Sequence, residues 1–258
     1  SRAWQKVSML ITMKIKRLFL STIFAMLLAP LAFATTVVTM VGDANYKPFI
    51  YDEQGVAKGK YVDIVSQAFE LMPDYELRWQ MMPWQEGLDA VKNGNAFAIV
   101  PPYYRPNERP WISPYSEPLY TEDFVVVCNN TAMSQPRNYF PNDYLGLTFT
   151  GDTGNTAGNP FSVLVKEGKI KLIESDSSMN NLEMVSSGQA DCYTNNSILV
   201  DNLMIDMPSL SKGLVIKKVS SENAHVGFAK NSSKFPYKND FIQKFNAALK
   251  QVKEHASK

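Results

Sequence analysis

Segments typical of buried β-strands alternate with amphipathic helical segments along most of this chain, and this order restricts the fold more than any other feature. The first part of the chain has strand and helix patterns in βαβαβ order, at 37–41, 62–72, 77–81, 84–92 and 96–100. Such an order predicts an α/β fold in which helices flank a parallel sheet.

The alternation starts again after Tyr120. The second part has strand and helix patterns at 124–128, 147–150, 161–166, 170–173, 179–186 and 191–194, then late strands at 214–219 and 226–229 and a closing helix at 240–254. Because a second α/β pattern is inserted before the last elements, the sequence indicates two lobes. We expect an N-terminal section of 1–34, a discontinuous first lobe of 35–121 plus 222–258, and a second lobe of 122–221.

The N-terminal section has the features of an export signal. Basic side chains precede an apolar run at 18–29, and Ala-Phe-Ala at 32–34 supplies the small-x-small pattern at which a signal peptidase cleaves. The apolar run is too short to cross a bilayer, which takes about 20 residues. We therefore expect 1–34 to be removed and the rest of the chain to be periplasmic, in a Gram-negative envelope.

Charge and cysteine content argue against several classes of function. Removal of 1–34 takes away five Lys and Arg and no acid, which leaves 21 basic side chains against 25 acidic ones. Nucleic-acid binding needs basic patches, so this balance argues against it. Two cysteines and two histidines are too few for a four-thiolate or histidine-rich site, so we expect no metal and no cofactor. In an exported protein Cys128 and Cys192 can form a disulfide or remain two buried thiols, and the sequence leaves both open.

Several short motifs, in a fixed order, resemble one known family. They are Tyr46-Lys47-Pro48-Phe49, Gly55, Gly59 with Asp63, and the segment 106–120, which reads Pro-Asn-Glu-Arg-Pro-Trp-Ile-Ser-Pro-Tyr-Ser-Glu-Pro-Leu-Tyr. With these motifs the chain resembles the amino-acid-binding members of the type II periplasmic binding protein family, from residue 37 to about 254. The resemblance implies two lobes, each a mostly parallel sheet flanked by helices, joined by two hinge strands near 120–124 and 220–225.

Arg109 is the main candidate for binding a ligand carboxylate. A guanidinium can offer two parallel N–H donors to a carboxylate, although a surface ion pair with Glu108 or Glu117 would also account for this residue. The resemblance implies the first role, because the equivalent arginine clamps the ligand α-carboxylate in relatives. The Thr-x-Glu-Arg turn of the family has lost its threonine here, where Pro106 stands.

A glycine turn in the second lobe is a candidate for the same carboxylate. The turn Gly151-Asp152-Thr153-Gly154 follows a predicted strand, and backbone N–H groups in such a turn attract anions. The resemblance implies that Thr153 and Gly154 meet the ligand carboxylate. Thr150 stands where some relatives carry a basic residue, so no second positive charge is expected from it.

Four aromatic residues are implied for the rest of the ligand. Relatives place aromatic side chains at the positions of Tyr46 and Trp84, on either side of the ligand side chain. Trp84 would equally suit the core-facing stripe of its predicted helix. Tyr103 and Tyr104 stand where relatives have small residues that expose backbone carbonyls to the ligand ammonium, so they would reshape that wall.

Asn195 and Asn196 mark the clearest departure from the family. Relatives place an aspartate at the position of Asn196, and it pairs with the ligand α-ammonium. The amide of Asn196 could still accept a hydrogen bond from a ligand ammonium, but it lacks the negative charge that would attract that ammonium. Either Asp43 alone meets the ammonium or the ligand lacks one, and we favour the second. A third possibility is a shifted register in which neither asparagine touches the ligand.

The resemblance implies a monomer that captures a small polar, carboxylate-bearing and amino-acid-like solute for an inner-membrane ABC permease, with no catalytic residue. One alternative is an exported enzyme on the same fold, similar to a cyclohexadienyl dehydratase. Such an enzyme would need an acidic side chain in the cleft to protonate a leaving hydroxyl. Glu108 and Asp152 are the two candidates, and we expect both to cap or solvate turns instead. The other alternative is a free-standing ligand sensor that docks on a receptor.

Overall fold

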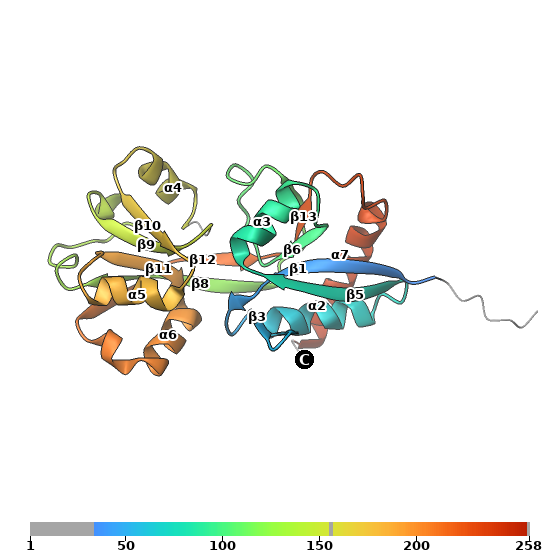
Figure 1. Cartoon of the computed structure of the whole chain (residues 1–258), viewed down its shortest axis with the longest axis horizontal. Helices are drawn as coiled ribbons and strands as arrows, with labels where there is room; N and C mark the ends of the chain where they lie inside the picture. Colours follow the sequence, from blue (N-terminus) through green and yellow to red (C-terminus); the bar gives the residue numbers. More distant parts are fainter. Residues whose placement is uncertain (1–33, 155–156, 257–258) are drawn as a thin grey trace, which may run out of the picture. The chain divides into compact units, whose positions relative to one another are not determined.

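The computed structural model describes residues 34–154 and 157–256, so the predicted export signal at 1–34 lies outside the described residues except for its last residue. In the described part, the chain from Thr36 onward forms two five-stranded sheets and one three-stranded sheet (Figure 1). A membrane-spanning helix is not found in this part, since no helix in it is both long and apolar enough.

The first sheet has the strand order β5-β1-β6-β13-β7. Its strands are β1 (Thr36–Asp43), β5 (Tyr75–Met82), β6 (Ala98–Val100), β7 (Ile112–Tyr115) and β13 (Gly227–Ala229). β1 pairs in parallel with β5 and β6, whereas β13 runs antiparallel to β6 and β7. A strand from near the end of the chain, β13, therefore lies between β6 and β7 in a sheet whose other strands come from the first half of the chain.

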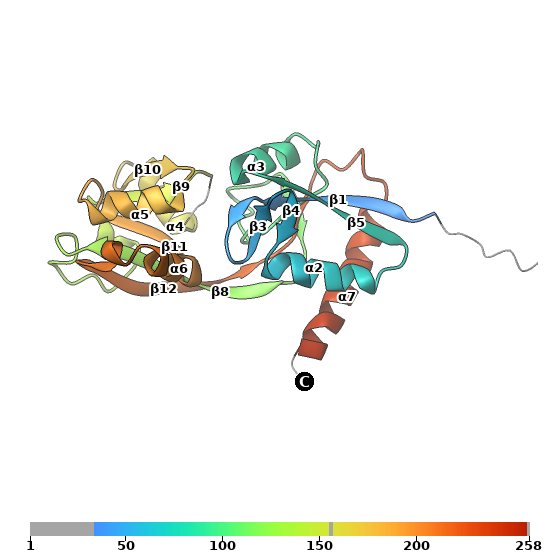
Figure 2. The ribbon, with the colours of Figure 1, turned by 60° about the horizontal axis from the view of Figure 1, so that its bottom comes forward.

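Helices cover both faces of the first sheet. They are α2 (Lys60–Glu70), α3 (Trp84–Lys92) and α7 (Lys238–Ala256). In β1, Val38 and Met40 pack in one cluster with α2 and α7, whereas Val41 packs with Leu88 of α3 on the opposite face. Figures 1 and 2 show α2 and α7 together on one side of the sheet and α3 on the other. Burial on both faces explains why Val38, Met40 and Val41 are all apolar although they point to opposite sides of the sheet.

The second sheet has the strand order β10-β9-β11-β8-β12. Its strands are β8 (Tyr120–Asn129), β9 (Thr148–Asp152), β10 (Lys171–Ser175), β11 (Cys192–Asn196) and β12 (Leu214–Ala224). β9, β10 and β11 are parallel, but β8 runs antiparallel to β11 and β12. Both sheets are thus mixed rather than mostly parallel, because the chain leaves the first sheet through β8 and returns through β12 and β13.

β8 and β12 connect the two sheets and pair with each other along their length. The ladder runs from the pair Tyr120 and Ala224 to the pair Asn129 and Leu214, with an irregularity between Lys218 and Ser220. Figure 1 shows both strands extending from one sheet toward the other. The stretches predicted as hinges, 120–124 and 220–225, lie opposite each other at the end of this ladder where Tyr120 pairs with Ala224.

Three helices and a disulfide complete the part around the second sheet. The helices are α4 (Asn159–Lys166), α5 (Ser178–Ser186) and α6 (Ser197–Asp206), with short 3₁₀ turns at Asn142–Tyr144 and Pro208–Ser211. Val125 and Val127 of β8 pack with α5 and α6, while Val126 and Cys128 face the side of α4. Cys128 and Cys192 lie opposite each other on β8 and β11 and form a disulfide, so the first of the two possibilities left open by the sequence, a disulfide rather than two buried thiols, is the one found.

The small sheet was not predicted. It consists of β2 (Asn45–Tyr46), β3 (Ile50–Glu53) and β4 (Val56–Lys58), which are antiparallel neighbours directly after β1. Gly55 has a φ of 81° in the turn between β3 and β4, a conformation that glycine adopts without strain. The small sheet places Tyr46 next to the end of β1.

Candidate functional site

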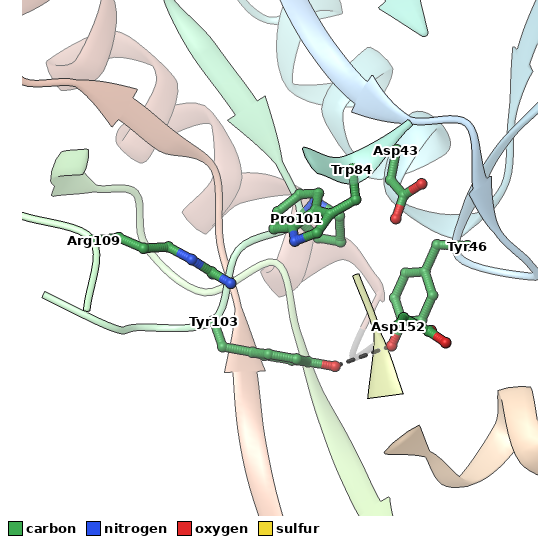
Figure 3. A pocket seen from close by; sticks show the side chains of 7 residues that line it. All are labelled: Asp43, Tyr46, Trp84, Pro101, Tyr103, Arg109 and Asp152. Carbon is green, nitrogen blue, oxygen red and sulfur yellow. Dashed lines mark hydrogen bonds between the residues drawn. The ribbon is translucent and has the colours of Figure 1, made fainter. Parts of the chain in front are cut away.

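A pocket lies where strands of the two sheets end. It is lined by Asp43, Tyr46, Trp84, Pro101, Tyr103, Arg109 and Asp152 (Figure 3). Asp43 is the last residue of β1 and Asp152 is the last residue of β9. In α/β folds, ligands bind outside the carboxyl ends of parallel strands, so both aspartates have a suitable position.

Arg109 brings a buried positive charge to this pocket. Its side chain is 4% exposed, and its Nη2 donates a hydrogen bond of 2.8 Å to the carbonyl oxygen of Gly154. The guanidinium carbon lies 5.4 Å from the ring centroid of Trp84, whose Nε1 donates to the same carbonyl at 3.3 Å. Burial lowers the pKa of Arg109 from its usual value, but arginine remains charged in proteins. The pocket therefore offers a desolvated cation, which attracts a carboxylate more strongly than an exposed one does.

Asp43 faces the pocket from the first sheet. It accepts a hydrogen bond of 2.9 Å from the backbone N–H of Asn45. Burial is the main cause that raises the pKa of Asp43 to about 7, and the negative charge of Asp152 adds to the rise. Near neutral pH this carboxyl group is thus poised between its neutral and charged forms.

Asp152 faces the pocket from the second sheet and is held by four donors. They are Ser178 Oγ at 2.9 Å, Asn181 Nδ2 at 2.8 Å, Tyr193 OH at 3.1 Å and Asn195 Nδ2 at 2.7 Å. Burial raises the pKa of Asp152 although these hydrogen bonds act in the opposite direction. The expectation that Asp152 merely caps or solvates a turn was wrong, because its side chain reaches into the pocket.

A second hollow shares part of this lining and extends it. Its lining residues are Asp43, Asn45, Tyr46, Pro83, Trp84, Gln85, Glu86, Asp152, Thr153, Asp176 and Ser178. Neither lysine nor arginine is among these described lining residues, whereas four of them are acidic. The extension therefore differs in charge from the region around Arg109.

Glu122 of β8 is the centre of a buried hydrogen-bond network behind the pocket. Its side chain is 1% exposed and accepts from the hydroxyls of Tyr46 at 2.5 Å and Tyr103 at 2.5 Å. It also accepts from the hydroxyl of Tyr61 and from Asn196 Nδ2, the latter at 2.6 Å. Burial and the adjacent Glu122 raise the pKa values of the three tyrosines, so the hydroxyls stay protonated and donate. The network fixes two tyrosines that line the pocket.

The structure brings together five of the predicted site residues, which are Asp43, Tyr46, Trp84, Tyr103 and Arg109. Thr153 lines the extension. Gly154 reaches Arg109 through its carbonyl oxygen. The N–H groups of the predicted anion turn are used within the protein, since Gly154 donates to Glu174 Oε1 at 3.1 Å and Thr153 to the carbonyl of Ser175 at 3.2 Å.

Five predicted site residues are not among those that line the pocket or its extension, and Gly154, which contacts Arg109, is one of them. Thr150 is buried and its hydroxyl donates to the carbonyl of Asn181, while Tyr104 is 60% exposed and lines a different groove. Asn195 supports Asp152 from behind. Asn196 accepts from two backbone N–H groups at the start of α6 and donates to Glu122, so its amide is already engaged.

Sequence reasoning missed the roles of Glu122 and Asp152. A signal for Glu122 exists, because it alternates with Tyr120 and Phe124 and so shares a strand face with an aromatic residue that is buried. A signal for Asp152 is its position at the end of a predicted parallel strand. In the described part of the chain, no group of three or more His, Cys, Asp or Glu side chains could hold a metal ion.

Solved structures similar to this chain share its fold. A histidine kinase sensor domain with similarity to periplasmic binding proteins has a TM-score of 0.69 at 14% identity, covering 86% of this chain and 92% of that one. A structure from a study of glutathione import via GshT and the cystine ABC importer TcyBC of Streptococcus mutans has a TM-score of 0.69 at 17% identity, covering 86% and 91%. The ancestral amino-acid-binding protein AncCDT-1, a precursor of cyclohexadienyl dehydratase, has a TM-score of 0.63 at 17% identity, covering 84% and 89%.

At these identities the structural similarity establishes the fold alone. No curated protein sequence matches the chain significantly. The family model of the bacterial extracellular solute-binding proteins, family 3, matches residues 38–257, which is most of the chain. This match confirms the resemblance found in the sequence motifs, and the chain belongs to the bacterial extracellular solute-binding proteins of family 3.

Proposed function

We propose that this family member captures a small carboxylate-bearing solute between its two sheets and delivers it to an inner-membrane ABC importer. The observation that carries the proposal is Arg109, a 4% exposed guanidinium that lines the pocket. Its hydrogen bond goes to a backbone carbonyl, and it takes part in none of the ion pairs found among the described residues, although Glu108 and Glu222 attract it at longer range. Because a buried charge is costly unless it is paired, a ligand carboxylate would stabilise this site.

The two sheets with their helices suit a closing movement. We take 35–121 plus 222–258 as one lobe and 122–221 as the other, with β8 and β12 as the hinge strands between them. The irregularity between Lys218 and Ser220 is a place where such a strand can bend. A ligand that touches residues of both lobes binds the closed arrangement more tightly and so shifts the population toward it.

Export and the importer partner belong to the same proposal. We place the protein in the periplasm as a monomer, after cleavage behind Ala34. The structural similarity to a protein from a study of import through an ABC importer supports transport. The similarity to a histidine kinase sensor domain supports the alternative of a sensor with the same pocket and another partner. Uptake of the labelled ligand by cells with and without the protein separates these two roles.

Native mass spectrometry of the purified protein tests the carboxylate site. We expect a bound small molecule in the wild-type protein and its loss from Arg109→Ala, with partial retention in Arg109→Lys, which keeps the charge but not the forked geometry. Arg78→Ala is the matched control, because Arg78 is exposed on β5, away from the pocket. Full retention of a carboxylate-bearing ligand by a folded Arg109→Ala variant would show that the arginine is wrongly assigned.

A second candidate function is an exported enzyme that eliminates a hydroxyl from a cyclic carboxylic acid. It is favoured by the pKa of about 7 at Asp43, because a general acid must hold its proton near neutral pH. The similarity to a precursor of cyclohexadienyl dehydratase also supports it. Turnover of prephenate by the wild-type protein, followed by ultraviolet absorbance and lost in Asp43→Asn, would favour catalysis, and absence of turnover would favour binding alone.

A further inference from the structure

A groove at the edge of the first sheet lies apart from the pocket. Its lining comes from β7, from the adjoining loop residues in 104–106 and 116–118, and from His225, which lies between β12 and β13. β7 is an edge strand of the first sheet. None of the described residues that line this groove also lines the pocket or its extension. The groove is therefore separate from the place where we propose that the solute binds.

His225 presents a hydrogen-bond acceptor to the groove. It is 9% exposed, and its Nδ1 lies 2.8 Å from the carbonyl oxygen of Ser116, which can only accept, so Nδ1 carries the proton. Burial is the main cause that lowers the pKa of His225 and favours the neutral ring. Nε2 forms no hydrogen bond within the described part of the chain, yet it is not one of the enclosed polar atoms that lack a partner. Its lone pair therefore reaches the surface in the groove.

Three aromatic rings share this groove. The ring centroids of Tyr104 and Tyr115 are 5.0 Å apart, those of Tyr115 and His225 are 5.8 Å apart, and those of Tyr104 and His225 are 6.5 Å apart. The planes of these pairs are inclined by 67°, 75° and 56°, in the same order. The hydroxyl of Tyr115 accepts from the backbone N–H of Arg105 at 3.3 Å, which fixes its ring. Rings set at an angle around one space are typical of aromatic cages that bind organic cations.

The polar groups of the groove also favour a cation. Glu117 is exposed there and takes part in none of the ion pairs found among the described residues. Pro106, Pro114 and Pro118 add apolar wall and have no backbone N–H to donate. Lys253 of α7 is close enough to affect His225, but neither it nor any arginine or other lysine is among the described lining residues. The lining thus offers acceptors and negative charge to a ligand, and few donors.

We propose that this groove binds a small organic cation, one N–H of which donates to Nε2 of His225. Tyr104 and Tyr115 would cover its apolar part, and Glu117 would balance its charge. The site is additional to the proposed capture of a solute and does not depend on it. It accounts for the large exposed ring of Tyr104, which lines this groove and not the pocket.

The imidazole nitrogens of the ¹⁵N-labelled protein provide the test. The sequence has two histidines, and His255, which is exposed near the end of α7, is the internal reference. Benzamidine, benzamide and benzoate are the probes, because they share one planar shape and differ in charge. Near pH 7.5 we expect benzamidine to shift the Nε2 signal of His225, with a dissociation constant of about 1 mM, and to leave His255 unchanged. Neutral benzamide should bind at least about 10-fold more weakly, and anionic benzoate should cause no shift.

Variants assign the probe to the groove. Tyr104→Ala removes a ring that is already 60% exposed, and we expect the affinity measured at His225 to fall at least about 3-fold. Glu117→Gln keeps the shape of the side chain and should weaken binding of benzamidine but not of benzamide. Tyr139→Ala removes another exposed tyrosine, which does not line the groove, and is the matched control that should bind benzamidine normally.

Four results would overturn the proposal. They are no benzamidine-induced shift at His225, an equal shift at His255, equal affinities for benzamide and benzamidine, and a normal affinity in the folded Tyr104→Ala variant. A proton found on Nε2 instead of Nδ1 without any probe would also overturn it, because the acceptor would then be absent. The proposed solute capture stands or falls separately, since the residues of the groove do not line the pocket.

Discussion

Replacement of Glu122 by alanine should lower the free energy of unfolding by about 3–5 kcal/mol. The carboxylate is 1% exposed and accepts hydrogen bonds from three tyrosine hydroxyls and one amide. A buried donor without an acceptor costs about 1–3 kcal/mol. Four unsatisfied donors would therefore cost up to about 12 kcal/mol, which is well above the loss of stability that we expect. Water entering the space left by the side chain would satisfy some donors, and the charge itself no longer has to be desolvated. If water satisfies about half of the four donors, the donors that remain unsatisfied cost about 3–5 kcal/mol.

The isosteric change Glu122→Gln should cost less, about 1–2 kcal/mol. The amide oxygen still accepts from two donors, and the hydroxyls facing the new NH₂ group can rotate and accept from it. Urea unfolding under oxidising conditions, followed by tryptophan fluorescence, measures both variants. Glu183→Ala on the exposed face of α5 is the control and should change stability by less than about 0.5 kcal/mol.

The reasoning about Glu122 would be refuted by two results. A cost below about 1 kcal/mol for Glu122→Ala would mean that water reaches the carboxylate and that the tyrosines do not depend on it. An equal cost for Gln and Ala would mean that the charge, and not the number of acceptors, maintains the network. In either case the fixed positions of Tyr46 and Tyr103 would need another cause.

One further prediction concerns the disulfide and another concerns the protonation of Asp43. Reduction of the disulfide between Cys128 and Cys192, which are 64 positions apart, should lower the free energy of unfolding by up to about 4 kcal/mol, and equal urea midpoints with and without reductant would contradict this. The pKa of Asp43 is about 7 in the folded protein and near 3.8 in the unfolded chain, so between these pH values the folded protein binds this proton more tightly than the unfolded chain does. The free energy of unfolding should therefore fall as the pH rises from about 3.8 to about 7. Asp43→Asn should make the thermal unfolding temperature depend less on pH in this range. The pKa of Asp152 is also raised by burial, so part of the pH dependence should remain in this variant. A pH profile identical to that of the wild-type protein would show that Asp43 titrates normally.

Elements with a one-sided apolar pattern could be predicted from the sequence. Helix α3 matches the predicted range of 84–92, because Trp84, Leu88 and Val91 form a single stripe and Asn93-Gly94 ends it. Helix α6 was missed for the opposite reason. Its apolar residues at 198–200 and 203–205 surround the helix, so no stripe distinguishes it from a strand or a loop.

The site was predictable where ordered motifs identify positions, and not where distant side chains meet. Arg109 belongs to a recognisable segment, and the structure places it in the pocket. The role of Glu122 depends on donors that lie up to 76 positions away along the chain, which no local pattern reveals. Asp152 resembles an ordinary turn residue until the fold brings Tyr193 and Asn195 beside it.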